Sequence, residues 1–270
     1  MSKLALAKLV AGPEEWDRRR LQVLLGIAVF VVIAVAVGIV WSVQALIAGN
    51  DPTTGDATES GPSEQQIANS GQSSANLSDA QPGPLSTGSA GTIALPQPGK
   101  LGESQVATGF PRTSAGALAQ LIAIDQRAIG SASVVTAQDV IATWAMPGGP
   151  TAQTWSGVEA VTVLLSSAGL PANGSTDLQV VLDPAMGSIK TDPADQTVMG
   201  CVDFVVTITV TGTAGRSPAN RIAVADCQRM VWNEGRWMIG QGTEPAPSPS
   251  LWPGTQASYD AGYQWLEVSP

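Results

Sequence analysis

Few residues of this sequence have side chains that could do chemistry. The chain contains no histidine, which excludes Ser-His-Asp triads, Cys-His pairs and imidazole ligands for zinc. No Ser-x-x-Lys spacing occurs. Asp192 and Asp195 in "KTDPADQT" lack the glycine and glutamate of a calcium loop, so we interpret them as a solvated turn. We therefore expect no catalytic residue, cofactor or metal site, and we expect that the protein is not an enzyme.

The two cysteines lie in segments whose apolar residues alternate, Val198 to Thr211 and Asn220 to Trp232. Such alternation predicts two half-buried strands. If the strands form a hairpin with Phe204 opposite Val224, their apolar faces match and Cys201 lies directly opposite Cys227. We predict a cross-strand disulfide at this pair. Two small buried thiols are the alternative, and the absence of a C-x-x-C motif disfavours a redox-active pair.

Other elements are predicted around this hairpin. Strands are expected at "DLQVVLD", "MGSIK" and "GRWMIGQ". Helical spacing of apolar residues predicts three preceding helices: from Thr113 or Ser114 to a stop at Gly130, from Ala137 to Ala145 after a cap at Thr136, and from about Thr154 to Ala168. Helices followed by an antiparallel sheet define an α+β fold, and we assign residues 108–270 to one such domain.

The N-terminal part of the chain has the pattern of a membrane anchor. Leu21 to Trp41 carries no charge and would span roughly 31 Å as a helix, close to the thickness of a bilayer core. Arg18, Arg19 and Arg20 directly precede it and indicate a cytoplasmic N-terminus. We predict a cytoplasmic tail over 1–20, a transmembrane helix over 21–47 and an extracytoplasmic remainder in a single-pass protein of the cell membrane. A cleaved signal peptide is the rival interpretation, although its apolar region is usually shorter.

Residues 48–107 are rich in serine, glycine and proline and have almost no aromatic or branched apolar side chains. Such a composition cannot offset the entropy of ordering, so a disordered linker is expected. The net charge of -9 argues against direct binding of nucleic acid.

Four aromatic residues lie in the C-terminal tail: Trp252, Tyr259, Tyr263 and Trp265. They are expected either to pack back onto the domain or to present an aromatic surface to a partner.

The order of anchor, linker and helices-then-sheet domain resembles the bitopic scaffold subunit of type IV secretion systems and its counterparts in conjugative elements of Gram-positive, high-GC bacteria. The stretches that carry the resemblance are "TGFPRTSAGALAQ", "RMVWNEGRWMIG" and "SLWPGTQASYDAGYQWLE". The resemblance implies a nuclear-transport-factor-like domain, in which a curved antiparallel sheet wraps around N-terminal helices. It implies an assembly role without catalysis and supplies no catalytic motif.

We therefore expect a non-catalytic, membrane-anchored scaffold of a conjugative DNA-transfer apparatus. Its expected partners are the lipid bilayer, other membrane subunits of the complex and further copies of the chain. An accessory membrane protein of a lipid-uptake (mammalian-cell-entry-type) system is an alternative with the same architecture. A ligand-binding extracytoplasmic domain, which would use the concave face of the sheet as a pocket, is a third possibility.

Overall fold

The computed structural model describes residues 76–191, 197–212, 215–216 and 219–269. The predicted cytoplasmic tail with Arg18, Arg19 and Arg20, the predicted transmembrane helix and the start of the predicted linker lie outside these residues. Asp192 and Asp195 lie outside them too. Within the described ranges, no helix has the length and apolar character needed to cross a bilayer.

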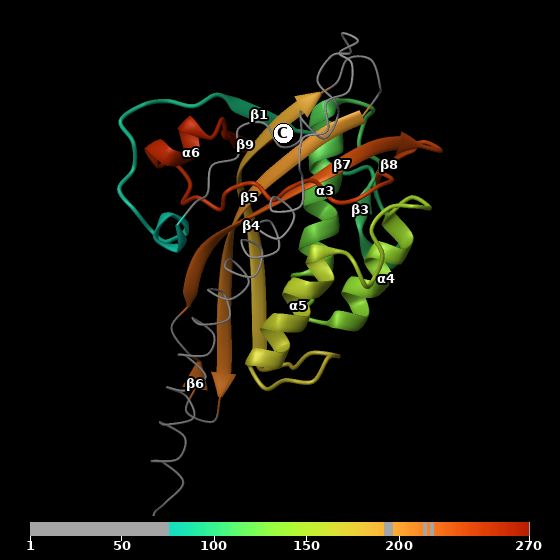
Figure 1. Cartoon of the computed structure of the whole chain (residues 1–270), viewed down its shortest axis with the longest axis vertical. Helices are drawn as coiled ribbons and strands as arrows, with labels where there is room; N and C mark the ends of the chain where they lie inside the picture. Colours follow the sequence, from blue (N-terminus) through green and yellow to red (C-terminus); the bar gives the residue numbers. More distant parts are fainter. Residues whose placement is uncertain (1–75, 192–196, 213–214, 217–218, 270) are drawn as a thin grey trace, which may run out of the picture.

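The described chain folds as an α+β domain in which helices pack on a curved half-barrel sheet (Figure 1). Its helices are η1 (Leu77–Ala80), η2 (Glu103–Gln105), α3 (Ser114–Ala128), α4 (Val134–Trp144), α5 (Ser156–Ser167) and α6 (Gln256–Asp260). Its strands are β1 (Thr92–Leu95), β2 (Lys100–Leu101), β3 (Ala107–Thr108), β4 (Leu178–Thr191), β5 (Thr197–Gly212), β6 (Gly215–Arg216), β7 (Asn220–Asn233), β8 (Arg236–Ile239) and β9 (Gln264–Val268).

The main sheet has the strand order β1-β9-β4-β5-β7-β8, with β6 paired to β5, while β2 and β3 form a separate small hairpin. Figure 1 shows α3, α4 and α5 together on one side of the long strands, and α6 with β1 and β9 at the other end of the view. The sheet is antiparallel apart from the β1–β9 pair, which is parallel. The predicted α+β class and the curved sheet with packed helices are confirmed.

Helix α3 begins and ends where the sequence predicts. Thr113 adopts an extended conformation and its side chain accepts a hydrogen bond from Gly116 N at 3.1 Å, which caps the first turn. The helix ends at Ala128, just before Gly130. A Cβ at position 130 would lie 2.3 Å from the carbonyl oxygen of Gln126, so the chain can leave the helix along this path only with glycine there.

The prediction for α4 was wrong at its start. The helix begins at Val134, and its cap is Ser133, whose side chain accepts from Thr136 N at 3.3 Å. Thr136 is therefore inside the first turn. The reason is that both residues can cap, and the chain uses the earlier one because Val134 N also bonds Ala172 O at 2.8 Å, a contact made across the fold. Helix α5 agrees with its prediction to within two residues at each end.

The predicted central hairpin is confirmed in register. Phe204 lies opposite Val224 and Cys201 lies opposite Cys227 in the ladder between β5 and β7. The two segments predicted as separate strands, "DLQVVLD" and "MGSIK", are instead one strand, β4. Its pairing with β5 shifts between Pro184 and Met186, so a bulge accommodates the proline and the strand continues.

The sheet carries one core on each face. The larger core joins the helices to the side of β5 that contains Val202, Phe204, Val206 and Ile208, as the alternation predicts. The smaller core lies on the opposite side and contains Met186, Cys201, Cys227, Leu251 and Tyr263. A sheet of this kind is therefore buried on both faces around the centre of the hairpin.

The predicted start of the domain at residue 108 was too late, because residues 76–107 already form helices and strands that pack on it. Strand β1 pairs with β9, the last strand of the chain, and Leu95 at its end is 4% exposed. Val106 is completely buried in the larger core. Composition did not indicate this order because the segment has no core of its own and is stabilised by contacts with the C-terminal tail and the helices.

Candidate functional site

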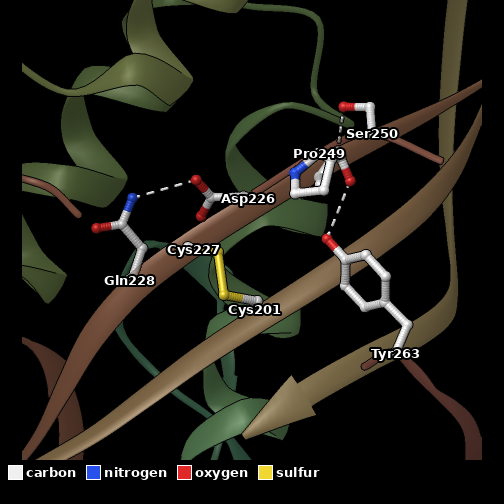
Figure 2. The surroundings of a disulfide bond; sticks show 8 residues. Cys201, Asp226, Cys227, Gln228, Pro249, Ser250 and Tyr263 are labelled. Atoms are coloured by element: carbon white, nitrogen blue, oxygen red, sulfur yellow. Dashed lines mark hydrogen bonds between the residues drawn. A yellow bond between two sulfur atoms is a disulfide. The ribbon is translucent and has the colours of Figure 1, made fainter. Parts of the chain in front are cut away.

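The disulfide is the first site that the sequence predicted, and it is confirmed. Cys201 and Cys227 are bonded, with their Cα atoms 4.1 Å apart, and each residue is 4% exposed. Figure 2 shows the bond spanning the two neighbouring strands beside Tyr263 and the segment of Pro249 and Ser250. Ser250 Oγ accepts from Ala225 N at 3.0 Å, which fastens that segment to β7. The bond therefore acts as a buried staple across the central hairpin.

The predicted aromatic surface is largely packed against the domain. Tyr263 is 1% exposed, and its hydroxyl donates to Pro249 O at 3.2 Å inside the smaller core. Trp252, Tyr259 and Trp265 are half-buried, and the guanidinium of Arg221 lies 5.5 Å from the Trp252 ring centre. Of the two predicted alternatives, Tyr263 therefore follows the first: it packs back onto the domain and is too buried to contact a partner.

A second site was not predicted from the sequence. Three carboxylic acids meet on the helix side of the sheet: Asp125 of α3, Asp226 of β7 and Glu244, which follows β8. We call these three residues the acid cluster. Asp125 is fully buried, and the carboxyl of Asp226 is the one hydrogen-bond partner of its carboxyl group among the described residues. An uncompensated charge in such a place is costly, so the cluster needs a proton or a partner.

Hydrogen bonds connect the acid cluster to the helix layer. Gln228 Nε2 donates to Asp226 Oδ1 at 3.2 Å, a contact visible in Figure 2, and to Glu244 Oε1 at 2.7 Å. Glu244 also accepts from Ser156 N at 2.9 Å and from Ser156 Oγ at 2.8 Å. Ser156 is the first residue of α5, so Glu244 lies at the positive end of that helix.

The pKa values of the two aspartates in the acid cluster are raised. Burial, followed by the negative charge of Glu244, raises the pKa of Asp226 to about 7. Burial, followed by the charges of Asp226 and Glu244, raises the pKa of Asp125 well above its ordinary value. Both residues therefore hold protons at a pH where exposed aspartates are ionised.

Another buried acid lies on the opposite face of the sheet. Asp203 of β5 is completely buried beneath the C-terminal tail, and burial raises its pKa although the backbone of Leu251 counteracts the effect. Burial and then the charge of Asp203 raise the pKa of Tyr263. A tyrosine in this position stays neutral and serves as a hydrogen-bond donor.

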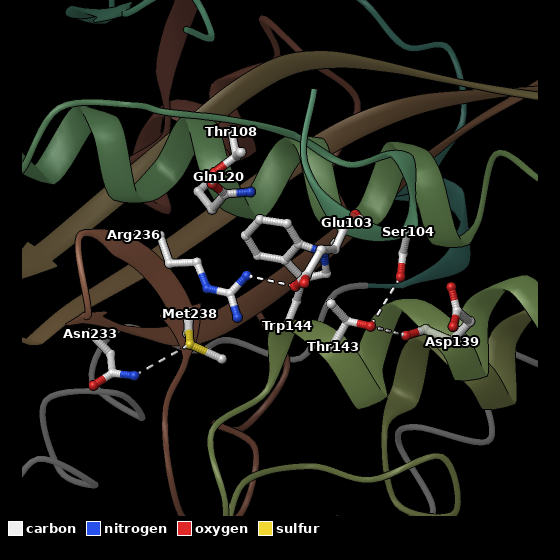
Figure 3. Close-up of polar contacts among 10 residues, drawn as sticks. All are labelled: Glu103, Ser104, Thr108, Gln120, Asp139, Thr143, Trp144, Asn233, Arg236 and Met238. Atoms are coloured by element: carbon white, nitrogen blue, oxygen red, sulfur yellow. Dashed lines mark hydrogen bonds and ion pairs between the residues drawn. The ribbon is translucent and has the colours of Figure 1, made fainter. Parts of the chain in front are cut away.

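A third site holds η2 against α4 and β8 (Figure 3). Arg236 pairs with Glu103 at 3.1 Å and lies 4.9 Å from the Trp144 ring centre. Ser104 and Gln105 have φ angles of 51° and 59°, an uncommon conformation for residues other than glycine. Arg127 Nε donates to Ser104 O at 2.9 Å and Ser104 Oγ lies 3.0 Å from Thr143 Oγ1. These contacts hold the strained turn in place.

The sequence contains a pattern from which the acid cluster could have been predicted. Asp226 and Gln228 occupy positions on the apolar face of the second strand, because Asp226 pairs with Val202. Asp125 occupies a core-facing position of α3, four residues after Leu121. A carboxyl at a position where the pattern requires an apolar side chain indicates a buried acid, and two such positions on facing elements indicate a cluster.

The chemistry open to these residues is limited. In the part of the chain that the structure describes, no group of three or more histidine, cysteine, aspartate or glutamate side chains has an arrangement suited to a metal ion. A general acid or base must reach its substrate, whereas Asp125 is fully enclosed. The acid cluster can hold and release protons, and the disulfide and the turn at Ser104 stabilise the fold.

Comparison with known proteins adds no relative: no family model, curated protein or solved structure matches the chain. The class of protein is therefore defined by the fold and the sites alone. It is an α+β domain with helices on a curved sheet, a stapled central hairpin and buried acids on both faces of the sheet.

Proposed function

We propose that the chain is a non-catalytic, membrane-anchored scaffold of a conjugative DNA-transfer, type IV secretion-like apparatus, with its folded domain outside the membrane. One observation carries the non-catalytic part. The concave face of the sheet, where a ligand would be expected to bind, is filled by α3, whose Leu118, Leu121 and Ile124 are completely buried against the larger core. The particular apparatus follows from the family resemblance of the sequence.

The disulfide supports the proposed location. Disulfides persist in oxidising compartments and are rare in the cytosol. The bond between Cys201 and Cys227 is therefore in keeping with a domain outside the membrane, as the arginines at 18–20 predict. The predicted linker over 48–107 loses its C-terminal part, because residues 76–107 belong to the described domain.

The location can be tested in cells. Rapid acid quenching followed by denaturation and labelling with a thiol-reactive polymer should leave the protein unshifted on a gel, because both cysteines are bonded. Reduction before labelling should add two labels. Two labels without reduction would contradict an oxidising location.

The assembly role can be tested by photo-cross-linking in membranes. Leu101 and Val135 are apolar side chains that are 69% and 60% exposed. Single exposed apolar residues are ordinary and do not define an interface, but they give positions for a probe. A photoreactive residue at either position of the full chain should yield discrete adducts larger than the monomer. The exposed polar residue Gln153 is the matched control position.

Recovery of the monomer alone from both apolar positions would contradict a scaffold. The nature of the captured subunits separates the two membrane systems. A conjugative ATPase or channel subunit supports the proposal, whereas subunits of a lipid transporter would replace it with the accessory lipid-uptake role.

A further inference from the structure

We propose that the acid cluster is a pH-sensitive fastening inside the fold. A proton held by the Asp125–Asp226 pair keeps the segment around Glu244 and the first turn of α5 docked on the sheet. Loss of this proton loosens both. The proposal goes beyond the scaffold role and does not depend on it.

The three acids of the cluster differ in how well their charges are compensated by hydrogen bonds. Glu244 accepts three hydrogen bonds, two from Ser156 and one from Gln228, so its negative charge is well compensated. Asp226 accepts from the same Gln228 amide and from the backbone of Cys227, and the Asp125 carboxyl has only the carboxyl of Asp226 as a partner among the described residues. The site therefore suits one carboxylate with protons on its neighbours, and it does not suit three carboxylates.

The other charged groups on the elements packed around the acid cluster are directed away from it. Arg127 of α3 donates to Ser104 O, and Arg236 of β8 pairs with Glu103. In the ladders, Arg229 of β7 and Lys190 of β4 pair with Met199 of β5, and Arg221 of β7 pairs with Thr207 of β5, which places all three cations on the disulfide side of the sheet. The remaining acids are Asp203, on that same side, and the exposed Asp183, Glu159 and Asp139. The charges that act on Asp125 and Asp226 are all negative.

Glu244 and the first turn of α5 are the parts of this site that can move. Asp125 and Asp226 lie within a helix and a central strand, where the backbone is held by regular hydrogen bonds. Glu244 lies in an irregular segment after β8. The capping of α5 also depends on this segment, because its N-cap residue Trp155 makes no side-chain cap and Glu244, 88 residues away, supplies this contact to Ser156. Repulsion in the cluster therefore acts on Glu244 and, through it, on α5.

The direction with pH follows from proton linkage. The pKa of Asp226 rises from 3.8 to about 7, so the folded state binds a proton more strongly than the unfolded chain. The stabilisation from this proton is fully present at low pH and is lost as the pH rises through neutrality. Docking is then tight in mildly acidic surroundings and looser in alkaline ones.

Hydrogen–deuterium exchange of the full chain in detergent micelles tests the proposal. Rates are measured from pH 5.5 to 8.5 and corrected for intrinsic exchange. For peptides covering 154–162 and 241–247 we expect the protection to fall by up to tenfold per pH unit between pH 5.5 and about 7, the slope for one linked proton, and to level off at higher pH, where the carboxyl is ionised in both states. Peptides from the centre of β5 should remain much better protected at every pH, which shows that 154–162 and 241–247 exchange through a local opening. Equal protection in both sets, or no slope at 154–162 and 241–247, would overturn the proposal.

Two variants assign the effect to the cluster. Asp226→Asn removes the titrating group while keeping its shape, and should flatten the pH dependence at 154–162 and 241–247. Asp203→Asn is the matched control, since it neutralises a buried acid on the other face of the same sheet, and should leave that dependence unchanged. If Asp226→Asn does not fold, Glu244→Gln keeps an oxygen for Ser156 and removes the repulsion, so it should flatten the dependence too. A wild-type slope in the variant that folds would refute the assignment.

Discussion

Asp203 and Asp226 lie in adjacent rows of one ladder and face opposite sides of the sheet. Asp203 pairs with Ala225, and Asp226 pairs with Val202. Alternation sends the first beneath the C-terminal tail and the second toward α3. Burial raises the pKa of both residues, so both make the folded state less stable as the pH increases.

The effect of Asp203 on stability can be isolated. Neither of its carboxyl oxygens has a side-chain partner among the described residues, so its ionised form is poorly accommodated. Asp203→Asn should increase the free energy of unfolding at pH 8 by about 1–3 kcal/mol, the usual cost of a buried polar group without a partner. At pH 4 the two proteins should differ little, because the native carboxyl is then protonated. Urea denaturation at both pH values measures this, and an equal difference at both would contradict it.

The disulfide should contribute measurably to stability. The bonded cysteines are 26 residues apart, and loop-closure entropy for a cross-link of this size corresponds to about 3.5 kcal/mol. The double variant Cys201→Ser, Cys227→Ser should lose this amount in urea denaturation. Reduced wild-type protein should behave like the variant, whereas the variant should be insensitive to reductant. Loss of stability in the variant on adding reductant would point to another cause.

At the scale of elements, local signals predicted those parts of the fold that are determined locally. Thr113 and Gly130 bound α3 in the sequence as in the structure. The register of β5 and β7 was predictable because a shift by one residue would turn Phe204 away from the core. The start of α4 was not, because Ser133 and Thr136 are both competent caps and a contact to Ala172 favours the earlier one.

The caps of α4 give a direct test of this correction. Ser133→Ala should cost about 1 kcal/mol of stability because it removes the acceptor for Thr136 N. Thr136→Ala keeps that hydrogen bond, which uses only the backbone of residue 136, and should cost much less. The midpoints of thermal unfolding of the two variants should differ accordingly. The reverse order would restore Thr136 as the cap.

The acid cluster and the edge strand could not be predicted as arrangements. Asp125 lies about 100 residues before Asp226 and Glu244 in the chain, and no local spacing relates the three. The apolar face that places Asp226 toward α3 was readable, but Glu244 reaches α5 through an irregular segment without a period. Likewise, β1 is only four residues long, lies in a segment rich in serine and glycine and ends before Pro96, and it is a strand because β9 offers an edge to pair with.

At the scale of the whole molecule, the two ends of the described chain hold each other. Trp252 N donates to Asp79 O at 2.6 Å, Ser86 N donates to Gly254 O at 2.8 Å, and β1 pairs with β9. Together they cover the smaller core that contains the disulfide. A pull on the chain before residue 76 would therefore reach the C-terminal tail before it reached the larger core.

Limited proteolysis distinguishes a domain that starts at residue 76 from one that starts at 108. A protease of low specificity should leave a resistant fragment that retains Asp79, because β1 and η2 fasten this segment at two places. Mass spectrometry of the fragment defines its start. Leu95→Asp places a charge where Leu95 is 4% exposed, and should release β1 so that trimming proceeds toward Lys100. A wild-type fragment that begins near residue 108 would instead assign residues 76–107 to the predicted linker.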